Sequence, residues 1–356
     1  MKILFLTRAY GQHAGGMERL SWEFVQAVSS QPGIEAQVIF HKGSRSASPL
    51  FNLLALPQAL RAARQADVIH LGDPMLAFLG FVLKKLIGKP IAVTVHGLDI
   101  VYPNSLYQLY LKLFFRNLDL YFPISKHVAN ILRQHGGPAE MAGKFHILKP
   151  GVTDRFYDPN IVREQLAKLL NQDITSKKIL FTSGRLVKRK GHEWFIREVL
   201  PKLPENVTYV IAGNGPEFLH LQGVAEGYSL EVGRVVLLGK VTNDQLKILY
   251  NTVDTFVMPN IPFKNDVEGF GLVLLEAALC NRPVFAANIE GIPDAIHSGQ
   301  NGTLLPAENP QAWLQALKNI PISVNTRAYT LAHFNWPVQA AAIAKSLSAA
   351  VPGQSA

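Results

Sequence analysis

The chain has 356 residues, of which 48% are hydrophobic and 17% charged, so it has enough apolar material for two domains of ordinary size. Its single cysteine, Cys280, excludes a disulfide framework within the chain and a four-cysteine zinc site. The longest apolar run, residues 75–83, is far shorter than the roughly 20 residues of a membrane-spanning helix. The apolar run after Lys2 is too short for a signal peptide. We therefore expect a cytoplasmic protein.

Positive charge is concentrated in the first half of the chain. Residues 1–150 hold 16 Lys and Arg against 8 Asp and Glu, whereas residues 151–356 hold 19 against 18. This imbalance indicates an anionic partner for the first half. We expect no nucleic acid, because there is no Lys/Arg-rich run and no zinc-finger or RNA-binding motif. An anionic membrane surface or an acidic substrate fits at least as well, and a charge bias that only aids solubility is the alternative.

Short strand patterns alternate with longer helical patterns through the first half. The predicted strands are 2–7, 36–40, 67–71, 90–95, 120–123 and 146–149, and the predicted helices lie near 17–30, 53–65, 75–87, 106–118 and 126–134. The strands are nearly continuous apolar runs, as in a parallel sheet that is covered on both faces. The alternation therefore predicts an open, doubly wound α/β domain.

The same alternation starts again after residue 175. The predicted strands are 178–183, 207–212, 234–238, 255–258 and 283–287, and the predicted helices lie near 193–203, 218–228, 243–251, 271–280 and 337–349. We therefore predict two Rossmann-like domains of the α/β class that face each other across a cleft. They span residues 1–155 and 156–335, and a last helix follows within 336–356.

Two motifs of the first half follow predicted strands. Gly15 and Gly16 open a helix, which bares backbone N–H groups at the positive end of its dipole and predicts an anion site. The pattern is not the dinucleotide fingerprint, which needs G-x-G-x-x-G and an acidic residue where this chain has His41. A helix start without a ligand is the alternative. His96, with Asp99 nearby, ends the fourth strand; a carboxylate could orient its ring toward a substrate hydroxyl, or His96 is structural.

A basic run, GRLVKRKG at 184–191, follows the first strand of the second half. Arg185 and Lys190 at a strand end predict a cationic clamp for a diphosphate, and a solvated basic loop is the alternative. The next strand ends in Gly213-Asn214-Gly215. The glycines let the backbone turn tightly near a base or phosphate, although a plain strand-to-helix turn explains them equally well.

The most specific stretch is EGFGLVLLE at 268–276. Its glycines free the start of a helix for close approach by a phosphate, with backbone N–H groups from Leu272 and Val273. Glu276 lies about one and a half turns into the helix and can accept hydrogen bonds from ribose hydroxyls. Glu268 and Glu276 beside a diphosphate are unfavourable unless sugar hydroxyls donate to them.

With these motifs in this order, the sequence resembles the retaining glycosyltransferases of the GT-B fold, family 4. The chain has Lys149-Pro150 where many members have Pro-Asn. The other matching motifs are Gly15-Gly16-x-x-Arg19, His96-Gly97-x-Asp99, Gly184-Arg185 with Lys190-Gly191, Gly213-x-Gly215-Pro216, Glu268-x7-Glu276 and Gly291-Ile292-Pro293-Asp294.

The resemblance implies that the second domain binds a nucleotide-diphospho-sugar. Arg185 and Lys190 would contact the diphosphate and Glu276 the ribose. Glu268 would hold sugar hydroxyls, and His96 would contact the transferred sugar. These implications make His96, Arg185, Lys190 and Glu268 the catalytic candidates. The expected donor-binding residues are Gly15, Gly16, Asp99, Gly184, Asn214, Gly215, Phe270, Gly271, Leu272, Val273 and Glu276.

The resemblance further implies catalysis without a metal or another cofactor, because cations and helix dipoles stabilise the departing diphosphate. The family retains the anomeric configuration, and the resemblance implies that the last helix, within 336–356, crosses back to the first domain. We favour a front-face route over a covalent intermediate, since no carboxylate nucleophile stands out opposite the clamp. An epimerase, a phosphorylase or a non-catalytic sugar-nucleotide-binding subunit are alternatives. An NAD dehydrogenase is disfavoured by the missing fingerprint.

The acceptor is expected to bind the basic first domain. We predict a lipid-linked or polysaccharide-precursor glycan, with a small soluble acceptor as the rival. The segment 106–116 is rich in Tyr, Phe and Leu beside Lys112 and Arg116. It fits peripheral contact with the anionic inner face of the plasma membrane, or a helix whose aromatic side chains are simply core.

Overall fold

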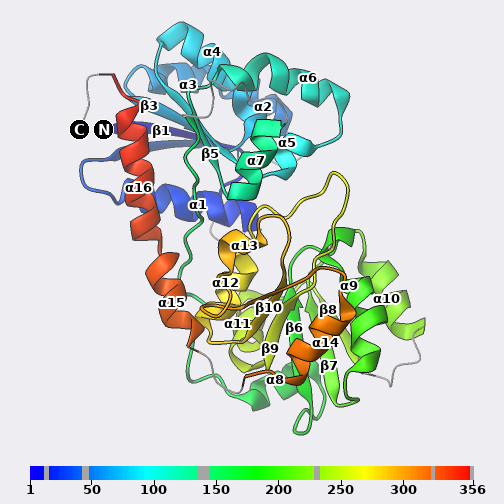
Figure 1. The fold of residues 1–356 in the computed structure, drawn as a ribbon. Coiled ribbons are helices and arrows are strands. Elements are labelled where there is room, and N and C mark those ends of the chain that lie inside the picture. Colours follow the sequence, from blue (N-terminus) through cyan, green and yellow to red (C-terminus); the bar gives the residue numbers. More distant parts are fainter. Residues whose placement is uncertain (12–15, 42–47, 135–143, 228–232, 322–324, 353–356) are drawn as a thin grey trace. The chain divides into compact units, whose positions relative to one another are not determined.

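The structure is a computed structural model that describes residues 1–11, 16–41, 48–134, 144–227, 233–321 and 325–352. The chain forms two compact units (Figure 1). The first combines Met1–Gly151 with Phe334–Ala356, and the second is Val152–His333. The structure thus divides the chain after Gly151 and groups its last helix with the first unit.

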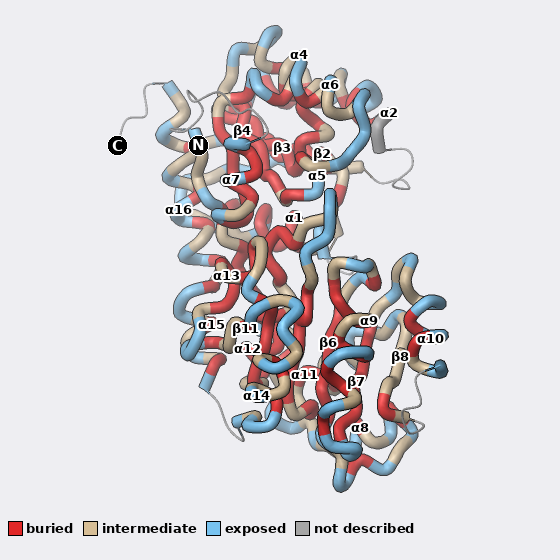
Figure 2. The backbone as a smooth tube through the Cα atoms, turned by 45° about the vertical axis from the view of Figure 1, so that its right-hand side comes forward, coloured by how far each residue is buried: buried red, intermediate tan, exposed pale blue. Residues whose placement is uncertain are grey.

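The first unit has a five-stranded parallel sheet of order β2-β1-β3-β4-β5. Side chains of β3, β4 and β5 are buried throughout, as continuous apolar strands require in a sheet covered on both faces (Figure 2). The elements are β1 (Lys2–Thr7), α1 (Gly16–Ser29), β2 (Glu35–Phe40), α2 (Ser48–Leu54), α3 (Leu56–Ala63), β3 (Val68–Leu71), α4 (Ala77–Ile87), β4 (Ile91–Val95), α5 (Leu98–Val101), α6 (Ser105–Phe114), β5 (Leu120–Pro123), α7 (Lys126–Gln134) and α16 (Trp336–Ala349).

The prediction of a strand at 146–149 was wrong. The N–H groups of His146 and Leu148 each donate to a carbonyl of β5 at 2.9 Å, so the segment lies along the edge of that strand. The next donor in this alternation would be residue 150, which is a proline and has no N–H. The pairing therefore stops before a regular strand forms.

The second unit has a six-stranded parallel sheet of order β11-β10-β9-β6-β7-β8 (Figure 1). Sequence analysis missed β11, α14 and α15. The elements are α8 (Arg163–Leu170), β6 (Lys178–Ser183), α9 (His192–Trp194), β7 (Val207–Ala212), α10 (Phe218–Gly227), β8 (Val235–Gly239), α11 (Asn243–Thr252), β9 (Thr255–Met258), α12 (Leu272–Leu279), β10 (Val284–Ala287), α13 (Ile292–Ala295), β11 (Thr303–Leu305), α14 (Pro310–Lys318) and α15 (Thr326–His333).

The helix predicted at 193–203 is irregular. After α9 the chain makes one wide π turn at Phe195–Val199 and then a 3-10 turn at Leu200–Lys202. Pro201 lies in that last turn, where it has no N–H to continue an α-helical ladder. Phe195 nevertheless stays fully buried, with its ring edge-on to Trp313 of α14 at 5.8 Å, so the missed helix α14 completes the core beside it.

The last helix, α16, is anchored to the first unit by Trp336. This side chain is buried, and its Nε1 donates a hydrogen bond to Glu23 of α1 at 2.9 Å. The ring also lies so close to Gly151 that a Cβ there would collide with it. Asn335 caps the helix by accepting from the N–H of Val338. The final helix is therefore part of the first unit's core.

We predict that Trp336→Ala lowers the free energy of unfolding of the first unit by about 3–5 kcal/mol, because it removes a large buried ring and leaves Glu23 short of one donor. Urea unfolding followed by circular dichroism measures this. Val338→Ala is the matched control on the same helix, since Val338 is 56% exposed and its truncation should change stability by no more than about 0.5 kcal/mol. Equal effects of the two substitutions would contradict the assignment.

Candidate functional site

The predicted site residues of the second unit follow three neighbouring strands. The segment 184–191 follows β6, 259–271 follows β9 and 288–291 follows β10, and these strands lie side by side in the parallel sheet. The carboxyl ends of parallel strands are where open α/β sheets bind ligands. The topology therefore brings Arg185, Lys190 and Glu268 to the same edge of the sheet, as their positions in the sequence predicted.

Glu268 lies at the centre of a buried cluster of opposite charges. Lys190 Nζ and Arg189 Nη1 each lie 2.5 Å from its Oε2. Asn260 Nδ2 donates to the same oxygen at 3.3 Å, and Arg189 Nε reaches Asp266 at 2.8 Å. We call Arg189, Lys190, Asp266 and Glu268 the cation–carboxylate cluster. Among the described residues, Glu268 Oε1 has no hydrogen-bond donor, so it can accept one from a ligand.

Electrostatics keep the cluster ionised. Burial by itself would raise the pKa of the Glu268 carboxyl, but Lys190 and Arg189 lower that pKa to about 2. Burial lowers the pKa of Lys190, and the charge of Glu268 opposes this shift. Glu268 is therefore an anion at any physiological pH and acts as a hydrogen-bond acceptor rather than as an acid.

The two residues of the expected diphosphate clamp lie in different surroundings. Lys190 is buried and bound to Glu268. The residue expected at the diphosphate and the residue expected at the sugar thus form one ion pair. Arg185 is exposed, and no described residue forms a hydrogen bond or ion pair with it. Sequence analysis missed Arg189. The one sequence signal for Arg189 was its place in the basic run. Nothing in the sequence shows which side chains of the 3-10 turn at Lys188–Lys190 point inward.

Gly213 and Gly215 have a structural role that the sequence left open. A Cβ at Gly213 would collide with the carbonyl of Gly184, and one at Gly215 would collide with the backbone of Leu186. These glycines let the loops after β6 and β7 pack backbone to backbone. Asn214 is exposed, and its carbonyl accepts from the N–H of Leu186 at 3.0 Å. Contact of Asn214 or Gly215 with a ligand stays a prediction.

The start of α12 presents unpaired backbone donors. Gly271 precedes the helix with φ of 93°, a conformation that suits glycine. In the described part of the chain, no acceptor lies within hydrogen-bond reach of the N–H groups of Leu272 and Val273. Phe270 is buried just before this turn. The helix start thus offers two N–H groups and a positive dipole end to an anion.

Glu276 is buried in α12 and bound on both oxygens. Its Oε1 accepts from Arg155 Nη2 at 2.9 Å, and its Oε2 accepts from the Tyr250 hydroxyl at 2.9 Å. Each carboxylate oxygen has a second lone pair, so a ribose hydroxyl could still donate to it. Sequence analysis missed both partners, since Arg155 lies in the linker and Tyr250 in α11 without any motif around them.

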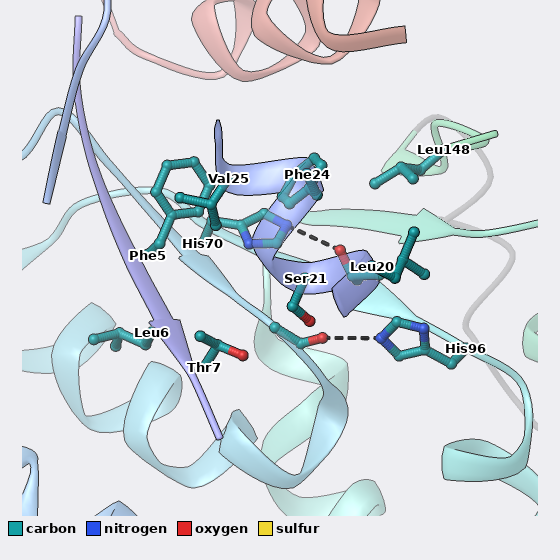
Figure 3. Close-up of a pocket in the computed structure, with 12 residues that line it drawn as sticks. Phe5, Leu6, Thr7, Leu20, Ser21, Phe24, Val25, His70, His96 and Leu148 are labelled. Carbon is teal, nitrogen blue, oxygen red and sulfur yellow. Dashed lines mark hydrogen bonds between the residues drawn. The ribbon is translucent and has the colours of Figure 1, made fainter. Parts of the chain in front are cut away.

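In the first unit, His96 is oriented by a backbone carbonyl (Figure 3). Its Nε2 donates to the carbonyl of Gly72 at 3.1 Å, so the neutral ring keeps Nδ1 as an acceptor. The expectation that a carboxylate orients the ring was wrong. The Asp99 carboxylate instead accepts from the backbone N–H groups of His96 and Gly97, at 2.9 and 2.7 Å for the shorter contacts. Contact of His96 with a transferred sugar stays a prediction.

A small cavity lies beside His96, between α1 and the strand ends. Its volume is about 20 Å³, which holds about one water molecule. Phe5, Phe24 and His70 line it together with His96 (Figure 3). Burial lowers the pKa of His70 to about 3, so His70 is neutral. This cavity is too small for a sugar. Gly16 opens α1 and is exposed, as expected, whereas Gly15 lies outside the described residues.

Helix α6 has two different faces. Tyr110 donates from its hydroxyl to the carbonyl of Met75 at 2.7 Å, and its ring stacks on Tyr107, so the aromatic face packs inward. Leu106, Leu109 and Leu113, which we call the leucine row, are 79%, 51% and 53% exposed. The core interpretation of this segment thus holds for its aromatic face, and contact of the leucine row with a membrane stays a prediction. Across the described ranges, no helix is long and apolar enough to cross a bilayer.

Family models match both halves of the chain. Residues 14–155 match the model described as Glycosyltransferase Family 4, and residues 177–320 match the one described as Glycosyl transferases group 1. The chain is 31% identical to an uncharacterized glycosyltransferase of Methanocaldococcus jannaschii, over 69% of this chain and 64% of that protein. It is 27% identical to a GDP-mannose-dependent alpha-(1-6)-phosphatidylinositol monomannoside mannosyltransferase of Mycolicibacterium smegmatis, over 83% of this chain and 82% of that protein. A sulfoquinovosyl transferase of Arabidopsis thaliana is 28% identical over 73% of this chain and 52% of its own length.

Solved structures share the fold. Anabaena HepE in complex with UDP superimposes with a TM-score of 0.76 at 21% identity, covering 98% of this chain and all of HepE. Sucrose-phosphate synthase from Thermosynechococcus elongatus gives a TM-score of 0.75 at 18% identity, covering 97% of this chain and 98% of the synthase chain. The predicted fold class, two Rossmann-like doubly wound α/β domains of the GT-B type, is confirmed. Because the two family models together match most of the sequence, this chain belongs to the family 4 glycosyltransferases.

Proposed function

We propose that this protein is a cytoplasmic, retaining and metal-independent glycosyltransferase. It moves a sugar from a UDP- or GDP-linked donor to a hydroxyl of a lipid-linked or polysaccharide-precursor acceptor. The observation that carries the proposal is the cation–carboxylate cluster, which lies in the loops after the adjacent strands β6 and β9, in the unit that also holds the open start of α12. A buried anion with a free oxygen, near unpaired cationic and N–H donors, suits a ligand with both hydroxyls and phosphates.

Different groups of the site bind different parts of the nucleotide-sugar donor, according to their charge. Arg185 and the N–H groups of Leu272 and Val273 can bind the diphosphate, because each is unpaired in the described structure. Glu276 accepts from the ribose, and Glu268 Oε1 accepts from a hydroxyl of the sugar. Among the relatives, one is named GDP-mannose-dependent, and the Anabaena structure holds UDP. Both nucleotides therefore stay candidates.

The reaction needs charge stabilisation on the leaving diphosphate. As the bond to the anomeric carbon breaks, negative charge develops on the departing phosphate oxygen, and Arg185 and the helix start stabilise it without reorganising. In a front-face route, the same phosphate oxygen takes the proton of the attacking acceptor hydroxyl, and the configuration is retained. Glu268 is held as an anion by two cations and orients the sugar rather than attacking it.

Two observations favour a membrane-bound acceptor. The leucine row lies on the same helix as Lys112, and Arg116 lies in the 3-10 turn that follows; both cations are exposed, and an apolar face beside cations suits an anionic interface. One relative is named for a phosphatidylinositol monomannoside substrate. A small soluble acceptor is the second candidate, because another relative, from Paenarthrobacter aurescens, is named D-inositol 3-phosphate glycosyltransferase and is 30% identical over 59% of this chain.

A panel of UDP- and GDP-sugars tests the activity directly. We expect one nucleotide-sugar to raise the melting temperature and to be hydrolysed slowly, with release of the nucleoside diphosphate. Glu268→Gln should abolish most turnover and leave nucleoside diphosphate affinity within a few-fold, since Glu268 contacts the sugar and not the nucleotide. Addition of EDTA should leave the rate nearly unchanged.

Three results would contradict parts of this proposal. Binding without hydrolysis or transfer for every donor and acceptor tried would favour a non-catalytic subunit. Loss of activity in EDTA with recovery in magnesium would exclude the metal-independent mechanism. An equal loss of nucleoside diphosphate affinity in Glu268→Gln would mean that Glu268 does not face the sugar.

Substitution of Arg185 isolates the diphosphate contact. We predict that Arg185→Ala raises the activation free energy by on the order of 2–4 kcal/mol, because leaving-group charge develops at this site. Its melting temperature should stay unchanged, since Arg185 is exposed and unpaired among the described residues. Lys188→Ala is the matched control, an exposed cation of the same loop. Similar kcat/KM losses in both variants would indicate a general charge effect and not a specific contact.

Vesicle sedimentation tests the membrane contact. We expect binding to phosphatidylglycerol vesicles and not to neutral phosphatidylcholine vesicles, with roughly 1 kcal/mol from each Lys or Arg at the surface. Binding should fade as salt rises, because the Debye length is about 8 Å at physiological ionic strength. Lys112→Glu with Arg116→Glu should weaken it and spare donor hydrolysis. Lys84 is a weaker candidate, since its Nζ is already bound to Asp119 at 2.6 Å.

The control for this experiment carries the same change of net charge in the second unit. Lys178→Glu with Lys318→Glu alters two exposed lysines and should leave sedimentation as in the wild type. If the wild type ignores anionic vesicles even at low salt, the soluble acceptor becomes the leading candidate.

A further inference from the structure

Glu290 has a backbone conformation that its residue type does not favour. It lies between β10 and α13 with φ of 53°. Five described residues other than glycine have positive φ, and three of them are asparagines, which tolerate the left-handed region. Glu290 and Glu308 are the other two. A glutamate gains nothing locally from this conformation, so the surrounding contacts must hold Glu290 in it.

Those contacts are with the backbone of Glu268. The Oε2 atom of Glu290 accepts a hydrogen bond from the N–H of Glu268 at 2.5 Å, and the N–H of Gly291 donates to the carbonyl of Glu268 at 3.0 Å. Residues 290–291 thus bind both the backbone N–H and the backbone carbonyl of Glu268. The two segments are in backbone contact, because a Cβ at Gly291 would collide with the carbonyl of Gly269.

The Glu290 carboxyl lies among the same charges as Glu268. Burial raises the pKa of Glu290 to about 7, and the negative charges of Glu268 and Asp266 add to this shift. The N–H of Glu268 and the charge of Arg189 oppose it. The ionised carboxylate is the stronger hydrogen-bond acceptor, so the contact with Glu268 strengthens as pH rises through neutrality.

We propose that Glu290 is a positioning residue for the donor sugar, whose carboxylate fixes the Glu268 backbone so that Oε1 of Glu268 stays presented to a sugar hydroxyl. The proposal rests on the proposed function, since it takes Glu268 as the sugar contact. It accounts for an unfavourable φ at a glutamate. A glycine at position 290 would relieve the backbone conformation but could not reach the Glu268 N–H.

Three variants separate strain, charge and hydrogen bonding. Glu290→Gly removes the carboxyl and relieves the positive φ. Glu290→Gln keeps an oxygen acceptor and removes the titration. Glu308→Gly is the matched control, because Glu308 has φ of 52°, is exposed and has no hydrogen-bond partner among the described residues. Glu308→Gly should therefore keep or raise the melting temperature. In Glu290→Gly, relief of the positive φ is opposed by loss of the hydrogen bond to the Glu268 N–H.

Hydrogen exchange at the Glu268 amide of the unliganded protein measures whether Glu290 holds this backbone group, without any substrate. We expect faster exchange at the Glu268 amide in Glu290→Gly, because that N–H loses its acceptor, and wild-type exchange in Glu290→Gln and Glu308→Gly. Peptides from β7 serve as an internal reference for global stability. Unchanged exchange at Glu268 in Glu290→Gly would overturn this inference alone.

Kinetics with the donor that the nucleotide-sugar panel identifies measure the effect of this positioning on catalysis. Glu290→Gly should lower kcat/KM for donor hydrolysis by about 10- to 100-fold, as expected when a contact group is displaced by about 1 Å, with nucleoside diphosphate affinity within a few-fold. Glu290→Gln should restore most of kcat/KM, and Glu308→Gly should match the wild type. Full activity of Glu290→Gly would overturn the inference.

The pH profile distinguishes positioning from simple packing. Wild-type kcat/KM for the donor should rise with an inflection near pH 7, which Glu290→Gln should lack. Stability has the opposite sign, because the folded-state pKa of Glu290 is raised to about 7; the stabilisation from its proton is complete below the unfolded pKa and is lost as pH rises through 7. An identical inflection in Glu290→Gln would assign it to another group. If no nucleotide-sugar binds the wild type, the proposed function fails, whatever the exchange data show.

Discussion

A carboxylate buried between two cations is the constraint on which the second unit's site depends. Glu268 would be costly to bury alone, and Lys190 and Arg189 would be equally costly without it. Because both cations reach one oxygen of Glu268, its other oxygen stays open. The loops after β6 and β9 meet in these ion pairs, and the loop after β10 joins them through the hydrogen bond between Glu290 and the Glu268 N–H. A site of this kind is rigid before its ligand arrives, which favours orientation over induced fit.

Much of the fold could be predicted from the sequence. Most parallel strands of both units are continuous apolar runs, although β2 is largely exposed. The motifs sit at the carboxyl ends of the strands, so Arg185, Lys190 and Glu268 could be placed at one edge of the sheet. The short β11 was missed because a three-residue strand has little period. The helices α14 and α15 were missed as well, although Asn309 followed by Pro310 is a helix-start signal for α14. Pro150 and Pro201 disrupted elements whose apolar pattern looked regular.

The partners of the site residues could not be predicted in the same way. Arg155 and Tyr250 lie far along the chain from the Glu276 carboxylate that they contact, and Glu290 lies far from the Glu268 backbone N–H that it binds; no spacing rule links them. The same holds for His96, where a backbone carbonyl does what a side chain was expected to do. A motif names groups that can meet a ligand. The groups that orient those residues come from any element that packing brings near, and only the folded chain identifies them.

The anchoring of α16 by Trp336 has a consequence for how the protein is made. The first unit closes on a helix that follows the whole second unit in the chain. During synthesis, residues 152–333 leave the ribosome while the hollow against Gly151 and α1 still lacks its indole. The second unit has all of its own strands by residue 305 and can fold first. The first unit can therefore complete its core only after the second unit has been synthesised, so its folding cannot finish in strict order from the N-terminus.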